Sequence, residues 1–137
     1  MTDQFTPLAG KRILVVDDSP QITALLRDVF DLCGAAVRVA NSGQDAMFQL
    51  RTAPFDLIVL DLVMPEPDGW DVLRFMRAAK PGLLRRTLLL TGDRYHRQTQ
   101  RGIDDAELPV VFKPFAVDDL RAAACDALFA AESRLAV

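Results

Sequence analysis

The chain has 137 residues, of which 50% are hydrophobic and 26% charged, a balance that fits one globular domain and leaves little apolar material for a second core. Its formal net charge of −3 excludes a global attraction to nucleic acid or to an anionic membrane, so neither is expected as a partner. No apolar run approaches the roughly 20 residues that span a bilayer, and the stretch MTDQFTPLAGK lacks the pattern of a secretory signal. A cytoplasmic location is therefore expected.

The first predicted elements are a strand and a helix. RILVV at 12–16 is a short apolar run rich in β-branched residues, which favours a strand. In the segment 19–34, Ser19 suits a helix cap, Pro20 the first helical position and Gly34 the helix end. Apolar side chains recur there at the three-and-four spacing of one buried face: Ile22, Leu25, Leu26, Val29, Phe30 and Cys33.

The rest of the chain repeats this alternation. Further strands are predicted at 36–40, 56–61, 87–91 and 109–112, and further helices at 41–53, 70–79 and 116–131. The inward residues expected on two of these helices are Ala46, Met47 and Leu50, and then Val117, Leu120, Ala124 and Leu128. The run DLIVLD has no polar alternation, which indicates that both faces of its strand are covered.

Two segments between these elements lack a clear period. KPGL at 80–83 is predicted to be a turn. Residues 93–107 are almost wholly polar where a fourth long helix is due, so this segment is expected to be short, frayed or irregular.

Alternating strands and helices predict an α/β fold, a doubly wound five-stranded parallel sheet with helices on both faces. In such sheets the ligand crevice lies beyond the carboxyl ends of the strands. Polar side chains at those ends are therefore the first candidates for a functional site.

Five such residues end four of the predicted strands: Asp17, Asp18, Asp61, Thr91 and Lys113. Each alone is a common turn or surface residue, but here they recur at four strand ends on one rim. Three carboxylates at one crevice repel one another and raise a pKa unless a cation joins them. Oxygen ligands without histidine or thiolate favour a hard ion such as Mg²⁺.

This set of groups predicts phosphoryl transfer onto an aspartate. A divalent ion and the Lys113 ammonium would neutralise charge on the phosphoryl oxygens, and the Thr91 hydroxyl can donate to one of them. Asp61 would be the attacking carboxylate.

The stretches VVDDS, DLIVLDLVMPEPDGWDVL, LLLTG and VVFKPF together make the chain resemble the receiver domain of two-component response regulators, as in the chemotaxis regulator. The resemblance implies a flavodoxin-like sheet with strand order 2-1-3-4-5. It also implies a single receiver domain over residues 10–132, with flexible tails at 1–9 and 133–137.

By resemblance, Asp61 is the phosphoacceptor. Asp18 and Asp61 would ligate Mg²⁺ directly together with the Val63 carbonyl, and Asp17 would act mainly through water. Thr91 and Lys113 would hold the phosphoryl oxygens.

The resemblance also assigns residues around the pocket. It implies a cis Lys113–Pro114 bond, and Pro65 and Gly69 match the loop that shapes the pocket floor. Val63 and Asp93 would flank the route of the hydrolytic water.

The resemblance implies a signalling phosphoacceptor and no enzyme acting on other substrates. The phosphoryl donor would be a phosphohistidine on a sensor histidine kinase or a histidine phosphotransfer protein, and phosphorylation would change a protein-interaction surface. The downstream target is unknown, and the family also admits a weak homodimer. Only one helix follows Phe115, so we expect no output domain in this chain, which would be a stand-alone receiver or part of a longer protein such as a hybrid kinase.

Two positions depart from the family pattern. The family often has an aromatic residue three positions before the lysine, where this chain has Val110. The segment 93–107 is also unusually polar. One hypothesis is that phosphorylation orders or releases residues 93–107.

Other functions remain open from the residues alone. An aspartate-nucleophile phosphatase of the haloacid dehalogenase type wants Asp-x-Asp after the first strand, where this chain has adjacent aspartates. A flavodoxin-like nucleotide binder requires a Gly- or Ser/Thr-rich phosphate cradle in this loop, which the chain lacks. A receiver that is no longer phosphorylated would normally have lost one of the five rim residues, and none is missing here. Cys33 and Cys125 show no metal spacing and are expected to be reduced thiols.

Overall fold

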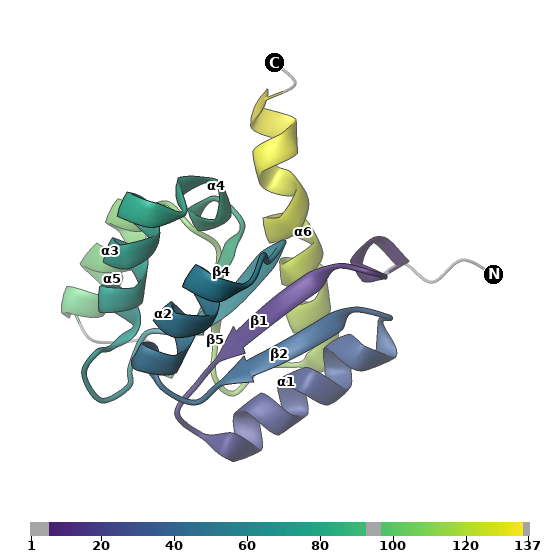
Figure 1. Cartoon of the computed structure of the whole chain (residues 1–137), viewed down its shortest axis with the longest axis horizontal. Coiled ribbons are helices and arrows are strands. Elements are labelled where there is room, and N and C mark those ends of the chain that lie inside the picture. The colour runs from purple at the N-terminus through teal and green to yellow at the C-terminus, as the bar shows by residue number, and fades with distance from the viewer. Residues whose placement is uncertain (1–5, 93–96, 136–137) are drawn as a thin grey trace.

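The computed structural model describes residues 6–92 and 97–135 of the chain. The strands are β1 (Arg12–Val16), β2 (Ala36–Ala40), β3 (Leu57–Asp61), β4 (Thr87–Thr91) and β5 (Val110–Phe112). All pairings are parallel and the strand order is β2-β1-β3-β4-β5, as the resemblance implied. The helices are η1 (Thr6–Leu8), α1 (Pro20–Leu32), α2 (Gly43–Thr52), α3 (Gly69–Ala79), α4 (Pro81–Leu84), α5 (Arg97–Ala106) and α6 (Val117–Leu135) (Figure 1).

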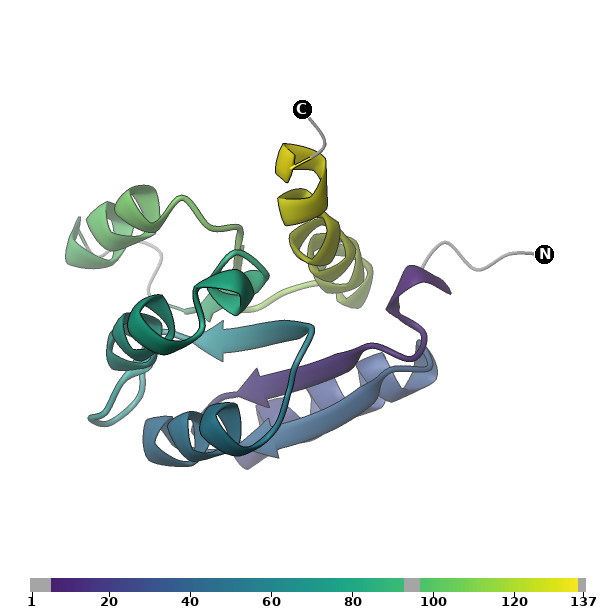
Figure 2. The ribbon, with the colours of Figure 1, turned by 45° about the horizontal axis from the view of Figure 1, so that its top comes forward.

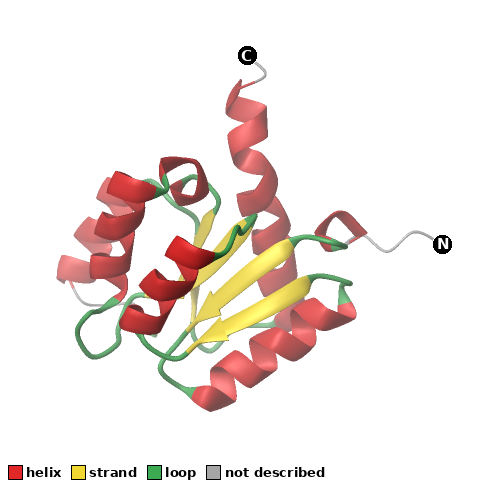
Figure 3. Cartoon of the chain, viewed as in Figure 1, coloured by secondary structure: helices red, strands yellow, loops and turns green. Residues whose placement is uncertain are grey.

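Helices cover both faces of the sheet (Figure 3). Because successive side chains of a strand point to opposite faces, the strands contribute side chains to two separate hydrophobic cores, one on each face of the sheet. Ile13 and Val15 of β1 belong to the core beneath α1 and α6, whereas Leu14 and Val16 belong to the core beneath α2, α3 and α5. Every residue of β3 and β4 is buried, which confirms the prediction that β3 is covered on both sides.

The start of α1 follows the predicted capping chemistry. The Ser19 hydroxyl accepts a hydrogen bond from the Ile22 backbone N–H, and Pro20 is the first helical residue. Gly34 takes a left-handed backbone with φ of +83° just after the helix, a conformation that glycine adopts without a steric penalty. The buried face is narrower than predicted, because Leu25 is 41% exposed.

The two segments without a clear period are both helical. KPGL, predicted to be a turn, instead supplies Lys80 as the cap and the first three residues of the one-turn helix α4 (Pro81–Leu84). The polar segment forms the ten-residue helix α5 from Arg97 to Ala106, so a short helix, one of the three expected alternatives, is what these residues form, and an irregular segment is not. Of the α5 side chains that the structure describes (101–106), only Ile103 is buried, so the position of the helix depends on few tertiary contacts.

The last helix is longer than predicted, and its first turn is more open. α6 continues to Leu135, and Figure 1 shows its end projecting away from the sheet. Val117, predicted to point inward, is 36% exposed, whereas Leu120, Ala124 and Leu128 are buried as expected.

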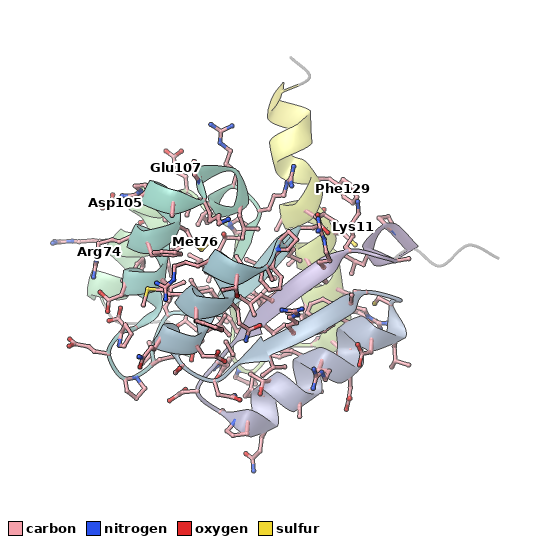
Figure 4. All side chains as sticks on the ribbon, viewed as in Figure 1. Lys11, Arg74, Met76, Asp105, Glu107 and Phe129 are labelled. Atoms are coloured by element: carbon pink, nitrogen blue, oxygen red, sulfur yellow. The ribbon has the colours of Figure 1, made fainter. Side chains whose placement is uncertain are left out.

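The start of the described chain packs beneath α6. Leu8 of η1 is fully buried, and the Lys11 ammonium lies 5.9 Å from the centre of the Phe129 ring of α6 (Figure 4), within the range of a cation–π contact. Neither Cys33 nor Cys125 forms a disulfide bond, in line with the expected reduced thiols. Within the described ranges, no helix is long and apolar enough to cross a bilayer.

Candidate functional site

The five predicted rim residues are carried by four strand ends on one edge of the sheet. Asp17 and Asp18 follow β1, Asp61 ends β3, Thr91 ends β4 and Lys113 follows β5. Because the strands are parallel, their carboxyl ends meet at this edge, and the strand arrows in Figure 2 point to the same side.

Three carboxylates converge there. Asp17, Asp18 and Asp61 each offer one oxygen, and these three oxygens lie within 4.8 Å of one another. Asp17 and Asp61 are buried and Asp18 is exposed. The cluster therefore has an inner pair of charges and one carboxylate open to solvent.

One cation of the chain reaches into this cluster. Lys113 Nζ lies 2.6 Å from Asp17 Oδ2 and 3.5 Å from Asp61 Oδ2. In this structure the lysine therefore pairs mainly with Asp17, a contact that the sequence reasoning did not predict. With Lys113 included, the four groups carry two net negative charges when all are ionised, which is the charge that one divalent cation neutralises.

Asp61 lies in an environment that disfavours its ionised form. Burial is the main reason that the pKa of Asp61 is raised to about 6, with the charge of Asp17 as the second cause. The Lys113 ammonium and the Val63 N–H, which donates to Asp61 Oδ1 at 3.2 Å, oppose this rise. A cation bound beside Asp61 would favour the carboxylate again.

A second set of contacts fixes Asp17. Its Oδ1 accepts a hydrogen bond from the Ser19 N–H at 2.9 Å. The Asn41 side-chain amide donates to the Asp17 carbonyl at 2.9 Å and to the buried Thr23 hydroxyl at 3.0 Å. Sequence reasoning missed Asn41 and Thr23. Asn41 directly follows β2 on the same rim, so the strand-end criterion would have found it.

Gly69 lets the loop after β3 lie close to the acceptor strand. Its N–H donates to the Leu62 carbonyl at 3.2 Å. A Cβ at this position would lie 2.3 Å from the Asp61 carbonyl oxygen and 2.5 Å from the Leu62 Cα, distances that only glycine avoids. This packing agrees with the implied place of Gly69 at the pocket floor.

The converging groups line an open pocket of about 390 Å³, formed by Asp17, Asp18, Ser19, Asp61, Val63, Gly92 and Lys113. Thr91 is fully buried at the end of β4, and its carbonyl accepts a hydrogen bond from the Lys113 N–H at 2.8 Å. The role of the Thr91 hydroxyl toward a phosphoryl group stays a prediction.

A second pocket adjoins the first at Lys113. It has a volume of about 340 Å³ and a mostly apolar lining, made by Ile22, Leu25, Lys113, Pro114 and Phe115. The Lys113–Pro114 peptide bond is cis, as the resemblance implied. The exposed Leu25 therefore lies beside the charged site.

The remaining predicted residues lie around the site or outside the described chain. Val63 is 53% exposed and Pro65 is exposed. Val110 is half-buried in β5 opposite Leu89, so the aromatic side chain common in the family is replaced by a small aliphatic one. Asp93 lies outside the described residues.

The donor set suits a hard divalent ion. The acidic cluster in the described part of the chain offers carboxylate oxygens and contains no histidine or cysteine, which favours Mg²⁺ over zinc. The same carboxylates would repel the phosphates of a nucleotide unless a cation lay between them. The residues present thus fit a magnesium site.

Comparisons with known proteins agree with this site. A family model described as the response regulator receiver domain matches residues 13–125. The virulence sensor protein BvgS of Bordetella pertussis is 36% identical over 124 residues, which cover 84% of this chain and 10% of that protein. The transcriptional regulatory protein CusR of Escherichia coli is 30% identical over 111 residues, which cover 81% of this chain and 48% of that protein.

A solved structure is similar as well. The response regulator protein TrrA of Thermotoga maritima, in complex with Mg²⁺-BeF, is 31% identical with a TM-score of 0.74, covering 85% of this chain and 98% of that one. The chain thus spans about half the length of CusR and a tenth of BvgS. With this fold and this family match, the chain belongs to the response regulator receiver domain family.

Proposed function

We propose that this chain is the phosphoacceptor of a two-component or phosphorelay system, and that Asp61 is the residue phosphorylated. The observation that carries the proposal is the convergence of three carboxylate oxygens within 4.8 Å, with the Lys113 ammonium 3.5 Å from Asp61. Family membership supports it, because receiver domains are signalling phosphoacceptors. The phosphoryl donor in this proposal is a phosphohistidine on a sensor histidine kinase or a histidine phosphotransfer protein.

In the transfer, an Asp61 carboxylate oxygen attacks the phosphorus atom. The bond from phosphorus to the imidazole nitrogen breaks, its electron pair leaves with the imidazole, and an acyl phosphate forms on Asp61. The Lys113 ammonium would move from Asp17 and Asp61 toward the added phosphoryl oxygens, and Thr91 would donate its hydroxyl to one of them.

Asp18 and Asp61 would hold Mg²⁺ directly with the Val63 carbonyl, and Asp17 would contribute mainly through water. When bound, Mg²⁺ would supply positive charge that offsets the negative charge on the phosphoryl oxygens. The exposure of Asp18 supports this role, because an ion can reach its carboxylate from solvent.

The chain would act only on itself, through its own phosphorylation and dephosphorylation. Water would reach the acyl phosphate past Val63, which is 53% exposed. The relatives carry such a region in two settings, a protein named as a sensor and a protein named as a transcriptional regulator.

The experiment is intact mass spectrometry after incubation with Mg²⁺ and a small phosphodonor. The wild type should gain the mass of one phosphoryl group, and Asp61→Asn or removal of Mg²⁺ with EDTA should prevent the gain. A gain by Asp61→Asn equal to that of the wild type would contradict the proposal. Steady phosphate release from unrelated esters would instead favour an aspartate-nucleophile phosphatase.

A further inference from the structure

An unusually close contact joins helices α3 and α5. A Cβ built on Gly102 of α5 would lie 2.4 Å from Cη2 of the Trp70 indole and within 2.9 Å of two further ring carbons. The outer edge of the indole therefore rests against the backbone of Gly102, and any larger residue at this position would displace one of the two groups. The absence of a side chain at Gly102 leaves the space that the Trp70 ring occupies.

A groove between the two helices adjoins this contact. This groove has a volume of about 240 Å³ and is lined by Trp70, Leu73, Arg74 and Arg77 of α3 and by Gly102, Asp105 and Ala106 of α5. Figure 4 shows Arg74 and Asp105 on the same side of the molecule, and Figure 2 shows α5 as the outermost helix there. Since Ile103 is the only buried side chain described in α5, the Trp70 contact is a large part of what positions this helix.

Trp70 is also linked through its own backbone to Asp61, the proposed phosphoacceptor. Trp70 follows Gly69, which is hydrogen-bonded to Leu62 and packs against the Asp61 carbonyl. The first turn of α3 is further fixed by reciprocal hydrogen bonds between Asp68 and Asp71, each side chain accepting from the other's backbone N–H. A continuous series of contacts therefore runs from the Asp61 backbone, through the first turn of α3, to the backbone of α5.

We propose that Trp70 couples the position of α5 to the state of Asp61. A phosphoryl group adds charge and oxygen atoms beside the Asp61–Val63 backbone, and Gly69 passes the resulting shift to the indole. Because packed contacts have discrete arrangements, the indole and Gly102 move together or separate. This inference rests on the proposed phosphorylation of Asp61 and names the residue through which it is read out.

The test is hydrogen exchange on peptides that cover Arg97–Ala106, with intact mass measured on the same samples. In the wild type, phosphorylation by a small phosphodonor with Mg²⁺ should change the exchange rates by about fivefold or more, the lower end of usual coupling between sites. Trp70→Phe lacks the outer ring, so it should take up the phosphoryl group normally and lose most of this change.

A pair of glycine substitutions tests the contact itself without phosphorylation. Gly102→Ala should speed exchange in α5 when Trp70 is present, because the added Cβ meets the ring, and should slow it in a Trp70→Phe background, where the outer ring carbons are absent and alanine favours the helix over glycine. Gly82→Ala is the matched control, because a Cβ there would have no atom within 4 Å.

The outcomes separate this inference from the proposed function. Absence of phosphoryl uptake by the wild type would overturn the proposed function and this inference with it. Normal uptake with the same exchange response in wild type and Trp70→Phe would overturn the inference alone. So would a Gly102→Ala effect in the same direction in both backgrounds.

Discussion

The Asp61 carboxyl group combines burial with two neighbouring carboxylates. Burial and the charge of Asp17 raise its pKa to about 6 from an ordinary value of 3.8. The folded protein without a divalent ion therefore binds a proton at Asp61 more readily than the unfolded chain does. Above about pH 6, ionised Asp61 lowers the free energy of unfolding. This destabilisation disappears below pH 3.8, where Asp61 is protonated in both the folded and the unfolded state.

We therefore expect Asp61→Asn to stabilise the metal-free protein at neutral pH. A pKa change of about two units corresponds to about 3 kcal/mol in the free energy of unfolding. The advantage of Asn over Asp should shrink as the pH falls through 6 toward 4. Urea unfolding in EDTA at a series of pH values measures this difference.

Asp56→Asn is the control, with the opposite sign. The hydrogen bond from Arg12 is the main reason that the pKa of Asp56 is lowered, so ionised Asp56 stabilises the fold, and this contribution is lost as the pH falls. Its substitution should lower stability at neutral pH. If Asp61→Asn were no more stable than the wild type at pH 7.5 in EDTA, the electrostatic account of the site would be wrong.

The residues of the rim could be predicted because each directly ends a strand. Since the strands are parallel, all of their carboxyl ends lie at one edge of the sheet, and these residues must lie there too. The Lys113–Asp17 ion pair could not be predicted, because it depends on side-chain distances that the order of residues does not contain. The same holds for the Trp70–Gly102 contact, since neither residue carries a sequence signal beyond ordinary helix packing.

Among the elements, α1 presents an apolar side chain beside the charged site. Leu25 is 41% exposed and lines the pocket that adjoins Lys113. On the proposed function, a phosphohistidine held by a protein would bring that protein against the surface around Asp61, whereas a small phosphodonor needs no such contact. Apolar area at the edge of a polar site favours contact with another protein.

We predict that Leu25→Ser slows phosphoryl transfer from the cognate phosphohistidine protein by about tenfold, the effect of losing about 1.4 kcal/mol of contact. Phosphorylation by a small phosphodonor should stay unchanged. Leu32→Ser is a matched control, because Leu32 belongs to the same helix, is 84% exposed and does not line this pocket. Equal rates for the two variants with the protein donor would contradict a docking role for Leu25.

Element prediction succeeded where the local signal was strong. The strands at 12–16, 36–40 and 87–91 were predicted with the bounds observed, because each is a short apolar run that ends at a polar or turn residue. α5 was poorly predicted, since among its described side chains only Ile103 is buried, which leaves no apolar period to read from the sequence. α4 is only four residues long, too short for any period to show.

At the scale of the whole molecule, a divalent ion should act as a folding ligand. An ion that binds the folded chain alone raises the free energy of unfolding, by about 2.7 kcal/mol when its concentration is 100 times the dissociation constant. We expect Mg²⁺ to raise the thermal midpoint of the wild type. Asp18→Asn should reduce this shift with little effect on the metal-free midpoint, because Asp18 is exposed.

Sodium chloride of equal ionic strength is the control for general screening. A shift of the same size with sodium chloride, or in Asp18→Asn, would show that the carboxylate cluster is not the ion site.

The doubly wound parallel sheet followed from the alternation of elements and the strong preference for right-handed crossovers, whereas its strand order was implied by the family resemblance. The family match over residues 13–125 agrees with it. A fold of this kind serves many functions, so the assignment depends on the residues at the strand ends.

Chemical mapping of the phosphorylated residue tests the central claim most directly. Borohydride reduces an aspartyl phosphate to homoserine, so reduction after treatment with Mg²⁺ and a small phosphodonor, followed by peptide sequencing by mass spectrometry, identifies the acceptor. We expect homoserine at position 61 and aspartate at positions 17 and 18. Homoserine at another position, with unmodified aspartate at 61 in protein that has gained a phosphoryl group, would contradict it.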